Sequence, residues 1–204
     1  MSTITNISQL NPNRIYTYAD YLTWQFEQTV ELIKGKIWKM SPAPKTRHQR
    51  ISFKLSGVFY NHINLKTCDV FSAPFDVRLY NKKKSKKANE DIFTVVQPDL
   101  CIICDKEKID ESGCLGAPDL IVEILSRGNS KKEMRIKYNL YEESGVKEYW
   151  IADPEHQTIH VFAFNEHEKY QLSKIYLRED VLQSVIFEDL KINLDEVFPE
   201  ENFE

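Results

Sequence analysis

The chain has 204 residues, of which 42% are hydrophobic and 28% charged, and its formal net charge is -4 at pH 7. This length and composition exclude an intrinsically disordered chain and allow one domain with a sizeable core. The acidic balance gives the whole molecule no general attraction to nucleic acids or anionic membranes, so any such binding must be local.

Apolar stretches, the N-terminus and the cysteines together indicate a cellular location. No stretch approaches the roughly 18–20 continuous apolar residues of a membrane span. The N-terminus has neither the basic start nor the apolar region of a secretion signal, so we expect a cytoplasmic protein whose four cysteines are reduced thiols. Cys101 and Cys104 form a C-x-x-C motif, but on a strand these two side chains point to opposite faces. We interpret them as small buried hydrophobes rather than zinc ligands.

The first quarter of the chain predicts a helix followed by a hairpin. The polar residues 1–14 predict a flexible segment, which precedes a single domain over residues 15–200. Thr17 and Asp20 resemble a capping box, which predicts a helix through roughly residue 26. Residues 30–40 predict two strands joined by a tight turn.

A long helix and several strands are expected next. From about Thr46, apolar residues recur at helical spacing and predict an amphipathic helix. Segments 69–80 and 91–104 are strand candidates, and a polar loop follows them. The lysine-rich run 82–87 between them is either a DNA-contacting loop or, as we prefer, a solvated hairpin tip.

The second half of the chain continues the alternation. A strand at 119–126 is followed by a helix that begins near Ser130 and ends at Gly145. Two further strands, 147–153 and 158–164, predict a hairpin, and the tail predicts a short strand and a final turn. The order indicates an α/β (α+β) fold in which helices flank a mixed β-sheet.

Glu123 is a carboxylate in the middle of an apolar strand, where a buried charge is costly unless it is paired or holds a metal. Asp119 shares its face but lies about 13 Å along the same strand, which is too far for both to bind one cation. Asp99 belongs to the preceding strand, and adjacent strands are about 5 Å apart. We therefore expect Asp99 and Glu123 to form a Mg²⁺ or Mn²⁺ site, and Asp119 to be structural.

Lys137 is the candidate cation for such a site. On the helix that follows the Glu123 strand, it falls within the arc of apolar residues, whereas Arg135 takes the opposite face. A cation beside a metal would stabilise the charge that develops during phosphodiester cleavage. The alternative is a lysine that extends to solvent from an apolar face.

Several motifs, in order, resemble the Uma-two family of endonucleases in the restriction-endonuclease-like, PD-(D/E)-x-K superfamily. They are QPDL at 97–100, PDLIVEILS at 118–126, K-x-x-L-Y at 137–141 and SGVKEYWIADP at 144–154. TYADYLTW near the start and ELIKGKIWKMSPAP, followed by a helix with His48, resemble the family's N-terminal half. The resemblance covers roughly residues 15–200.

The resemblance implies a restriction-endonuclease-like core of order α-β-β-β-α-β, with an N-terminal helix and a β-hairpin. Asp99 and Glu123 would hold the divalent metal, with the main-chain carbonyl of Ile124 as an additional ligand. The superfamily lysine normally stands where this chain has Leu125, and its role maps to Lys137 on the next helix.

Two nearby residues leave alternatives open. Glu31 is either an auxiliary residue, as a ligand or as a group that orients the lysine, or an exposed hairpin residue. We interpret His48 as a surface histidine rather than as a group that supports a metal ligand.

The sequence thus predicts a metal-dependent endonuclease that hydrolyses phosphodiester bonds in DNA, with Mg²⁺ or Mn²⁺ as cofactor. Because double-strand cleavage by this fold class usually requires two subunits, we expect a homodimer. The rival is a non-catalytic nucleic-acid- or protein-binding module on the same fold. A purely structural scaffold would require Glu123 to pair with Arg127 or Arg135 instead of a metal.

Overall fold

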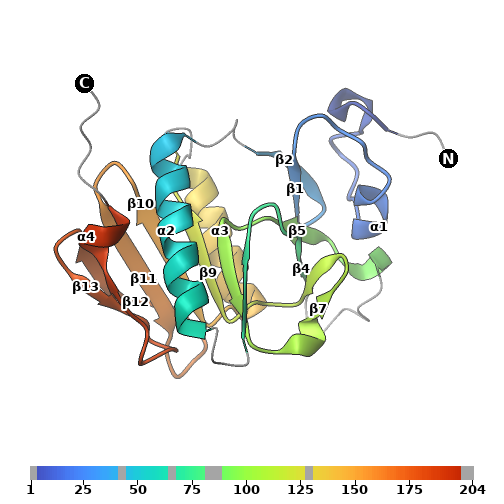
Figure 1. The fold of residues 1–204 in the computed structure, drawn as a ribbon. Helices are drawn as coiled ribbons and strands as arrows, with labels where there is room; N and C mark the ends of the chain where they lie inside the picture. The colour runs from blue at the N-terminus through green and yellow to red at the C-terminus, as the bar shows by residue number, and fades with distance from the viewer. Residues whose placement is uncertain (1–3, 41–44, 64–67, 81–88, 127–130, 199–204) are drawn as a thin grey trace.

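A computed structural model describes residues 4–40, 45–63, 68–80, 89–126 and 131–198 (Figure 1). The lysine-rich run 82–87 and Ser130, both singled out above, lie outside these residues.

The elements of the first half of the chain include one long helix, α2. In order they are η1 (Ile7–Gln9), α1 (Tyr18–Tyr21), β1 (Val30–Ile33), β2 (Lys36–Lys39), α2 (Thr46–Ile63), β3 (Asp69–Ser72), β4 (Val77–Leu79), η2 (Asn89–Asp91), β5 (Thr94–Val96) and β6 (Leu100–Ile103). The second half contains the other long helix, α3. Its elements are η3 (Lys106–Lys108), β7 (Ile109–Asp110), β8 (Gly113–Leu115), β9 (Leu120–Ile124), α3 (Lys131–Ser144), β10 (Glu148–Asp153), β11 (Thr158–Phe164), β12 (Tyr170–Leu177), β13 (Val181–Gln183), β14 (Lys191–Asn193) and α4 (Leu194–Val197).

The main sheet has the expected mixed architecture. Within the described ranges, it contains six strands in the order β12-β11-β10-β9-β6-β3. β9 and β10 are parallel, whereas the other neighbouring strands are antiparallel. Along the chain, α2, β3, β6, β9, α3 and β10 follow one another with other elements inserted between them. The predicted α-β-β-β-α-β core is therefore confirmed.

The two long helices pack on opposite faces of this sheet (Figure 1). Leu120, Val122 and Ile124 of β9 join a core cluster with the buried face of α2, which consists of Ile51, Leu55, Phe59 and Ile63. Ile121 points the other way, into a cluster with Leu140 and Tyr141 of α3. Each such buried side chain contributes roughly 1.5–3 kcal/mol.

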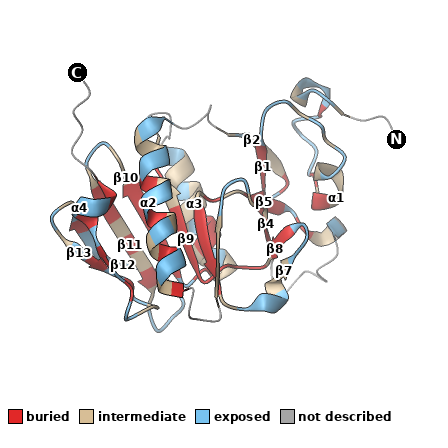
Figure 2. Cartoon of the chain, in the orientation of Figure 1, coloured by how far each residue is buried: buried red, intermediate tan, exposed pale blue. Residues whose placement is uncertain are grey.

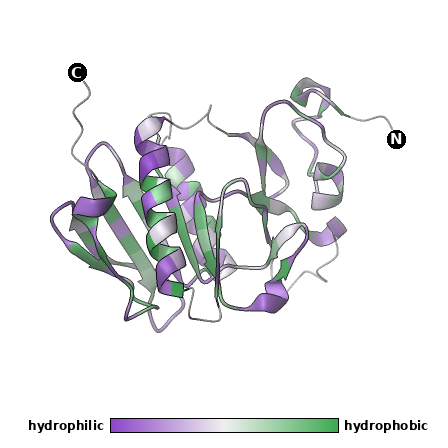
Figure 3. Cartoon of the chain, viewed as in Figure 1, coloured by the Kyte–Doolittle hydropathy of each residue, from purple (hydrophilic) through white to green (hydrophobic). Residues whose placement is uncertain are grey.

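Burial and hydropathy along the chain follow this arrangement of helices on the sheet. Buried residues follow the strands and the inner faces of the helices (Figure 2). Hydrophobic residues run along one side of α2, while its outer side is largely hydrophilic (Figure 3).

A second sheet packs beside the first and was not expected from the sequence. In the described part of the chain it has six strands, in the order β2-β1-β5-β4-β8-β7. It includes the predicted hairpin, whose turn has Lys34 at φ 50° and Gly35 at φ 77°. The segments expected as single strands, 69–80 and 91–104, each divide between the two sheets, with Pro74 and Pro98 at the breaks.

The expected polar loop after β6 also contains structure. Residues 105–118 include η3, β7 and β8, and β8 pairs in parallel with β4. Gly113 has φ +115°, and a Cβ there would lie 2.2 Å from the carbonyl oxygen of Asp76. This approach of two backbones requires glycine, and it joins the loop to the second sheet.

The N-terminal helix is shorter than expected. The capping box is present, since Thr17 Oγ1 accepts from the amide of Asp20 and Asp20 accepts from the amide of Thr17, but α1 ends at Tyr21. Trp24 forms an isolated β-bridge with Ile4 and stacks on Phe26. Packing of these aromatic side chains overrides the helical pattern. The flexibility expected for residues 1–14 stays a prediction.

The cysteines behave in two ways. Cys101 is free and buried, as expected, and so is Cys114, whereas Cys104 is half-buried and is not a free thiol. Cys68 and Cys104 form a disulfide that joins the residue before β3 to the residue after β6. The expectation of four reduced thiols was therefore wrong for this pair, because the β3–β6 pairing brings together two cysteines that are distant in sequence.

No helix among the described residues is long and apolar enough to cross a membrane.

Candidate active site

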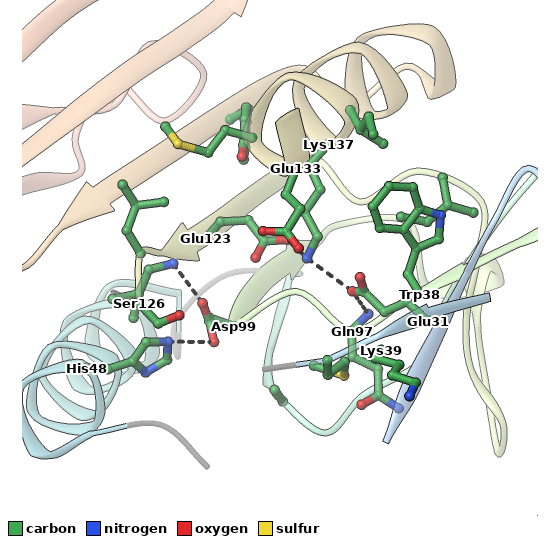
Figure 4. Close-up of a pocket in the computed structure, with 18 residues that line it drawn as sticks. Glu31, Trp38, Lys39, His48, Gln97, Asp99, Glu123, Ser126, Glu133 and Lys137 are labelled. Atoms are coloured by element: carbon green, nitrogen blue, oxygen red, sulfur yellow. Dashed lines mark hydrogen bonds and ion pairs between the residues drawn. The ribbon is translucent and has the colours of Figure 1, made fainter. Parts of the chain in front are cut away.

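Asp99 and Glu123 lie side by side at one end of the main sheet. β6 and β9 are antiparallel, with Leu100 opposite Val122. Asp99 comes directly before Leu100 and Glu123 directly after Val122, so this register brings Asp99 next to Glu123. Both line a cavity of about 200 Å³ at the ends of α2 and α3 (Figure 4). The structure therefore places the two carboxylates as the strand argument expected.

The carboxylate of Asp99 is fixed on both oxygens. Oδ2 accepts a 2.7 Å hydrogen bond from the amide of Ile124, and Oδ1 lies 3.2 Å from Nε2 of His48. The first bond ties the start of β6 to the end of β9, and the second ties it to the first turn of α2. Asp99 is thus positioned by three elements at once.

The interpretation of His48 as a surface histidine was wrong. Its side chain is only 11% exposed. Burial alone would lower the pKa of His48, but the hydrogen bond and charge of Asp99, with the charge of Glu123, raise it above its ordinary value. A sequence signal was available, because His48, Ile51 and Leu55 share the i, i+3, i+7 spacing of one helix face.

Glu123 faces α3 and meets two of its side chains. Its Oε1 accepts from Lys137 Nζ at 2.8 Å and from the Tyr141 hydroxyl at 2.5 Å. Lys137 and Tyr141 are four residues apart, so they lie on the same side of the helix. Lys137 therefore points into the cavity, whereas Arg135 is exposed.

Glu31 completes the group from the other sheet. It lies on β1, is 5% exposed, and accepts from the amide of Gln97 at 3.0 Å and from Lys137 Nζ at 3.1 Å. Figure 4 shows Lys137 between Glu31 and Glu123. The exposed-hairpin alternative for Glu31 is excluded, and its contact is the one expected of a residue that orients the lysine.

Gln97 and Asp76 extend this network away from the cavity. Gln97 Nε2 donates to Asp76 Oδ1 at 2.7 Å, while its main-chain amide holds Glu31. Gln97 was not among the site residues expected from the sequence. Its position in QPDL, two residues before Asp99, was the available signal.

Negative charge is in excess in the cavity. Burial raises the pKa of Glu123 to about 7; Lys137 opposes this rise, while Asp99 and Glu31 add to it. Burial would lower the pKa of Lys137, but Glu123 and Glu31 outweigh burial and raise it. Lys137 therefore stays protonated, and one ammonium faces three carboxylates.

The donor set fits a hard divalent cation. Carboxylates and a main-chain carbonyl are oxygen ligands of the kind that Mg²⁺ and Mn²⁺ prefer, and Asp99, Glu123 and Ile124 all line the cavity. No group of three or more His, Cys, Asp or Glu side chains in the described ranges is placed to hold a metal. Two carboxylates and a carbonyl form a partial set of the kind Mg²⁺ uses when it keeps several waters.

Asp119 and Leu125 do not join the charged group in the cavity. Asp119 is absent from the cavity lining; it accepts from the amide of Cys104 at 2.9 Å and pairs with Lys147 at 2.7 Å. Its contacts are structural, as expected. Leu125 lines the cavity and brings no charge to it. Arg135 does not pair with Glu123, and Arg127 lies outside the described residues.

Comparisons with known proteins agree with this architecture. A structure described as a putative nuclease belonging to DUF820 from Anabaena variabilis ATCC 29413 superposes with a TM-score of 0.67 and 20% identity, over 89% of this chain and 97% of that one. At this identity the likeness shows the fold. An uncharacterized protein of Synechocystis sp., slr1290, is 27% identical over 124 residues. The match covers 60% of this chain and 60% of that relative.

The family comparison covers most of the chain. Residues 18–195 match Uma2, a family described as "Putative restriction endonuclease". This range includes β1, both long helices and every residue placed in the cavity above. The chain belongs to the Uma2 family.

Proposed function

We propose that residues 15–200 form a single domain that acts as a metal-dependent endonuclease and hydrolyses phosphodiester bonds in DNA. The observation that carries the proposal is the convergence of Asp99, Glu123 and Lys137 on one cavity. Asp99 directly precedes β6, Glu123 lies on β9 and Lys137 lies on α3, so only the folded chain brings them together.

In this proposal Asp99, Glu123 and the carbonyl of Ile124 hold Mg²⁺ or Mn²⁺. The ion supplies Lewis-acid activation of water and charge neutralisation at the phosphate. The amide of Ile124 and the ring of His48 keep the Asp99 carboxylate oriented. Tyr141 does the same for Glu123 by donating to Oε1.

Lys137 acts as an electrostatic group rather than as a base. Its raised pKa keeps the ammonium protonated, so it has no free lone pair to accept a proton. Glu31 fixes it from the opposite side, at 3.1 Å. A fixed cation in a part-buried cavity stabilises the charge that develops on a phosphate in the transition state.

Two further parts of the proposal, DNA as substrate and a homodimer, rest on the family resemblance. A cytoplasmic location is proposed from the sequence alone. The Cys68–Cys104 disulfide is uncommon for that compartment. Thiol titration of protein purified under non-reducing conditions tests the bond.

The experiment is cleavage of supercoiled plasmid by the purified protein with Mg²⁺ or Mn²⁺. We expect Asp99→Ala and Glu123→Ala each to lower the rate by at least about 10²–10³. The matched control is Glu143→Ala, which removes a carboxylate from the exposed face of the same α3. Cleavage that persists equally in both cavity variants would overturn the assignment.

The rival function, a non-catalytic nucleic-acid- or protein-binding module, is favoured by one observation. Leu125 lines the cavity at the position where the superfamily has its lysine. Such a module gives no calorimetric signal with Mg²⁺ or Mn²⁺ and no metal-dependent turnover. Titration of the metal into wild-type protein and into Glu123→Ala separates the two functions without relying on activity.

A further inference from the structure

Basic residues are concentrated in one segment of this acidic chain. Residues 32–68 contain eight Lys and Arg and no Asp or Glu, which leaves 19 of the 27 basic residues and all 31 acidic residues elsewhere. The segment includes β2 and α2, and both elements line the cavity, through Trp38 and Lys39 from β2 and His48 from α2. This segment therefore brings positive charge, with no acidic residue of its own, to elements that line the cavity.

Two of these lysines serve the fold. Lys34 pairs with Glu143 of α3 at 2.6 Å. Lys36 donates to the main-chain carbonyls of Pro12, Asn13 and Arg14. These contacts attach the hairpin to its neighbours, so neither lysine is available for a ligand.

Five of the remaining basic residues lie on β2, on α2 or directly before α2, and Lys66 lies outside the described residues. We call Lys39, Lys45, Arg47, Arg50 and Lys54 the basic rim; all but the half-buried Arg47 are exposed. None of the ion pairs between described side chains involves Lys39, Lys45 or Lys54. In the described structure no carboxylate neutralises these three lysines, of which Lys39 lines the cavity.

The rim also has a regular geometry. Arg47, Arg50 and Lys54 follow i, i+3, i+7 spacing on α2, so they form one stripe along the flank of the helix. The stripe begins next to His48, in the turn that contacts Asp99. Seven residues of helix rise about 10 Å, which corresponds to roughly three nucleotides of a strand at 3.4 Å each.

The cavity floor has the opposite charge, since Glu31, Asp99 and Glu123 lie there. A polyanion approaching the cavity would meet attraction at the rim and repulsion at the floor, unless a bound cation neutralised the carboxylates. This arrangement favours a chain of phosphates that lies along α2 and enters the cavity at one point.

We propose that the basic rim binds the sugar-phosphate backbone of a nucleic acid and leads it across the cavity. The inference rests on the function proposed above and adds the surface that holds the substrate. Its source of affinity is phosphate charge, so binding is sequence-independent and weakens steeply with salt.

The test measures binding without cleavage, in EDTA, by fluorescence anisotropy of a short labelled DNA duplex over a series of salt concentrations. The variant is Lys39→Gln, Lys45→Gln and Lys54→Gln combined, all exposed positions whose change leaves the core intact. We expect weaker binding and a salt slope reduced by about one unit per lysine, about three in all. The matched control combines Lys169→Gln, Lys174→Gln and Lys191→Gln, which are exposed lysines at β12 and β14.

The outcomes separate this inference from the proposed function. Loss of binding in the rim variant alone supports the rim, whether or not the wild type cleaves plasmid. Equal binding by the rim variant and the control overturns the rim, even if the wild type cleaves. The rim variant is also tested for binding to vesicles of anionic lipid. If it loses vesicle binding to the same degree as DNA binding, the inference is overturned, since the rim would then be a general site for anionic surfaces. Unchanged thermal unfolding of both variants confirms that folding is not the cause.

Discussion

The strand β9 region carries two carboxylates four residues apart, and the structure treats them differently. Asp119 pairs with Lys147, whose side chain is 60% exposed, and also accepts from the amide of Cys104. Burial would raise the pKa of Asp119, but Lys147 and the Cys104 amide outweigh it and lower the pKa. Glu123 shares Lys137 with Glu31 and lies beside Asp99, and its pKa is raised to about 7.

The difference separates a structural charge from a functional one. Asp119 has one cation and one amide for a single carboxylate, so its charge is balanced where it stands. Glu148 on the adjacent β10 is balanced too, since it accepts from Trp150, Ser184, Val185 and Ile186. Around Glu123, three carboxylates compete for one lysine. A charge imbalance that the fold maintains is the kind of feature that a bound cation explains.

Exchanging the two lysines for methionine tests this comparison most strongly. Lys137→Met is expected to lower plasmid cleavage by about 10²–10³, because a fixed charge beside the phosphate is lost. Lys147→Met removes the partner of the other β9-region carboxylate and is expected to leave the rate of folded protein unchanged. Initial rates at saturating metal measure both. Equal losses in the two variants would mean that the two pairs do not differ in function.

For Glu148, whose charge is fully hydrogen-bonded, we predict a large effect on stability rather than on cleavage. Glu148 is fully buried, and its carboxylate accepts hydrogen bonds from backbone amides. Glu148→Gln would place an amide NH₂, which is itself a donor, against these donors. We expect a loss of about 4 kcal/mol in the free energy of unfolding, measured by urea denaturation. Cleavage per folded molecule should stay the same. Glu166→Gln, at an exposed turn, is the control and should change neither quantity.

Sequence reasoning recovered the local part of this site. The periodicity of 131–144 placed Lys137 inward, and strand spacing selected Asp99 over Asp119 as the neighbour of Glu123; both placements are seen in the structure. These inferences succeeded because they depend on one helix and two adjacent strands. The helical spacing of His48 was equally readable but was set aside in favour of the usual exposure of histidine.

The non-local part was not recoverable in this way. The second sheet, the division of 69–80 and 91–104 between two sheets, and the Cys68–Cys104 bond all depend on pairing between distant segments. A strand pattern states that a segment is extended, but it does not name the partner strand. Gln97 was missed for the same reason, because its importance comes from Glu31 on a strand of the other sheet.

The opposite pKa shifts predict opposite pH dependences. The pKa of Glu123 is raised from 4.5 to about 7, so its folded form binds a proton more tightly than the unfolded chain does. Its contribution to the free energy of unfolding is fully present below about pH 4.5 and is lost as pH rises through about 7. At 1.4 kcal/mol per pKa unit, the loss is on the order of 3 kcal/mol. Urea unfolding in EDTA across this window measures it. In Glu123→Gln this loss should be absent; an identical pH profile in both proteins would contradict the assignment.

Asp119 gives the smallest effect and the reverse sign. Its pKa is lowered from 3.8, so its contribution is present at neutral pH and is lost as pH falls below that value. We expect Asp119→Asn to cost about 1–2 kcal/mol at neutral pH, because the Cys104 amide keeps an acceptor while the pairing with an exposed lysine is worth little. The difference from wild type should shrink at acidic pH, and plasmid cleavage should be unaffected. If Asp119→Asn abolished cleavage while Glu123→Ala did not, the metal site would have to be sought at the opposite end of β9.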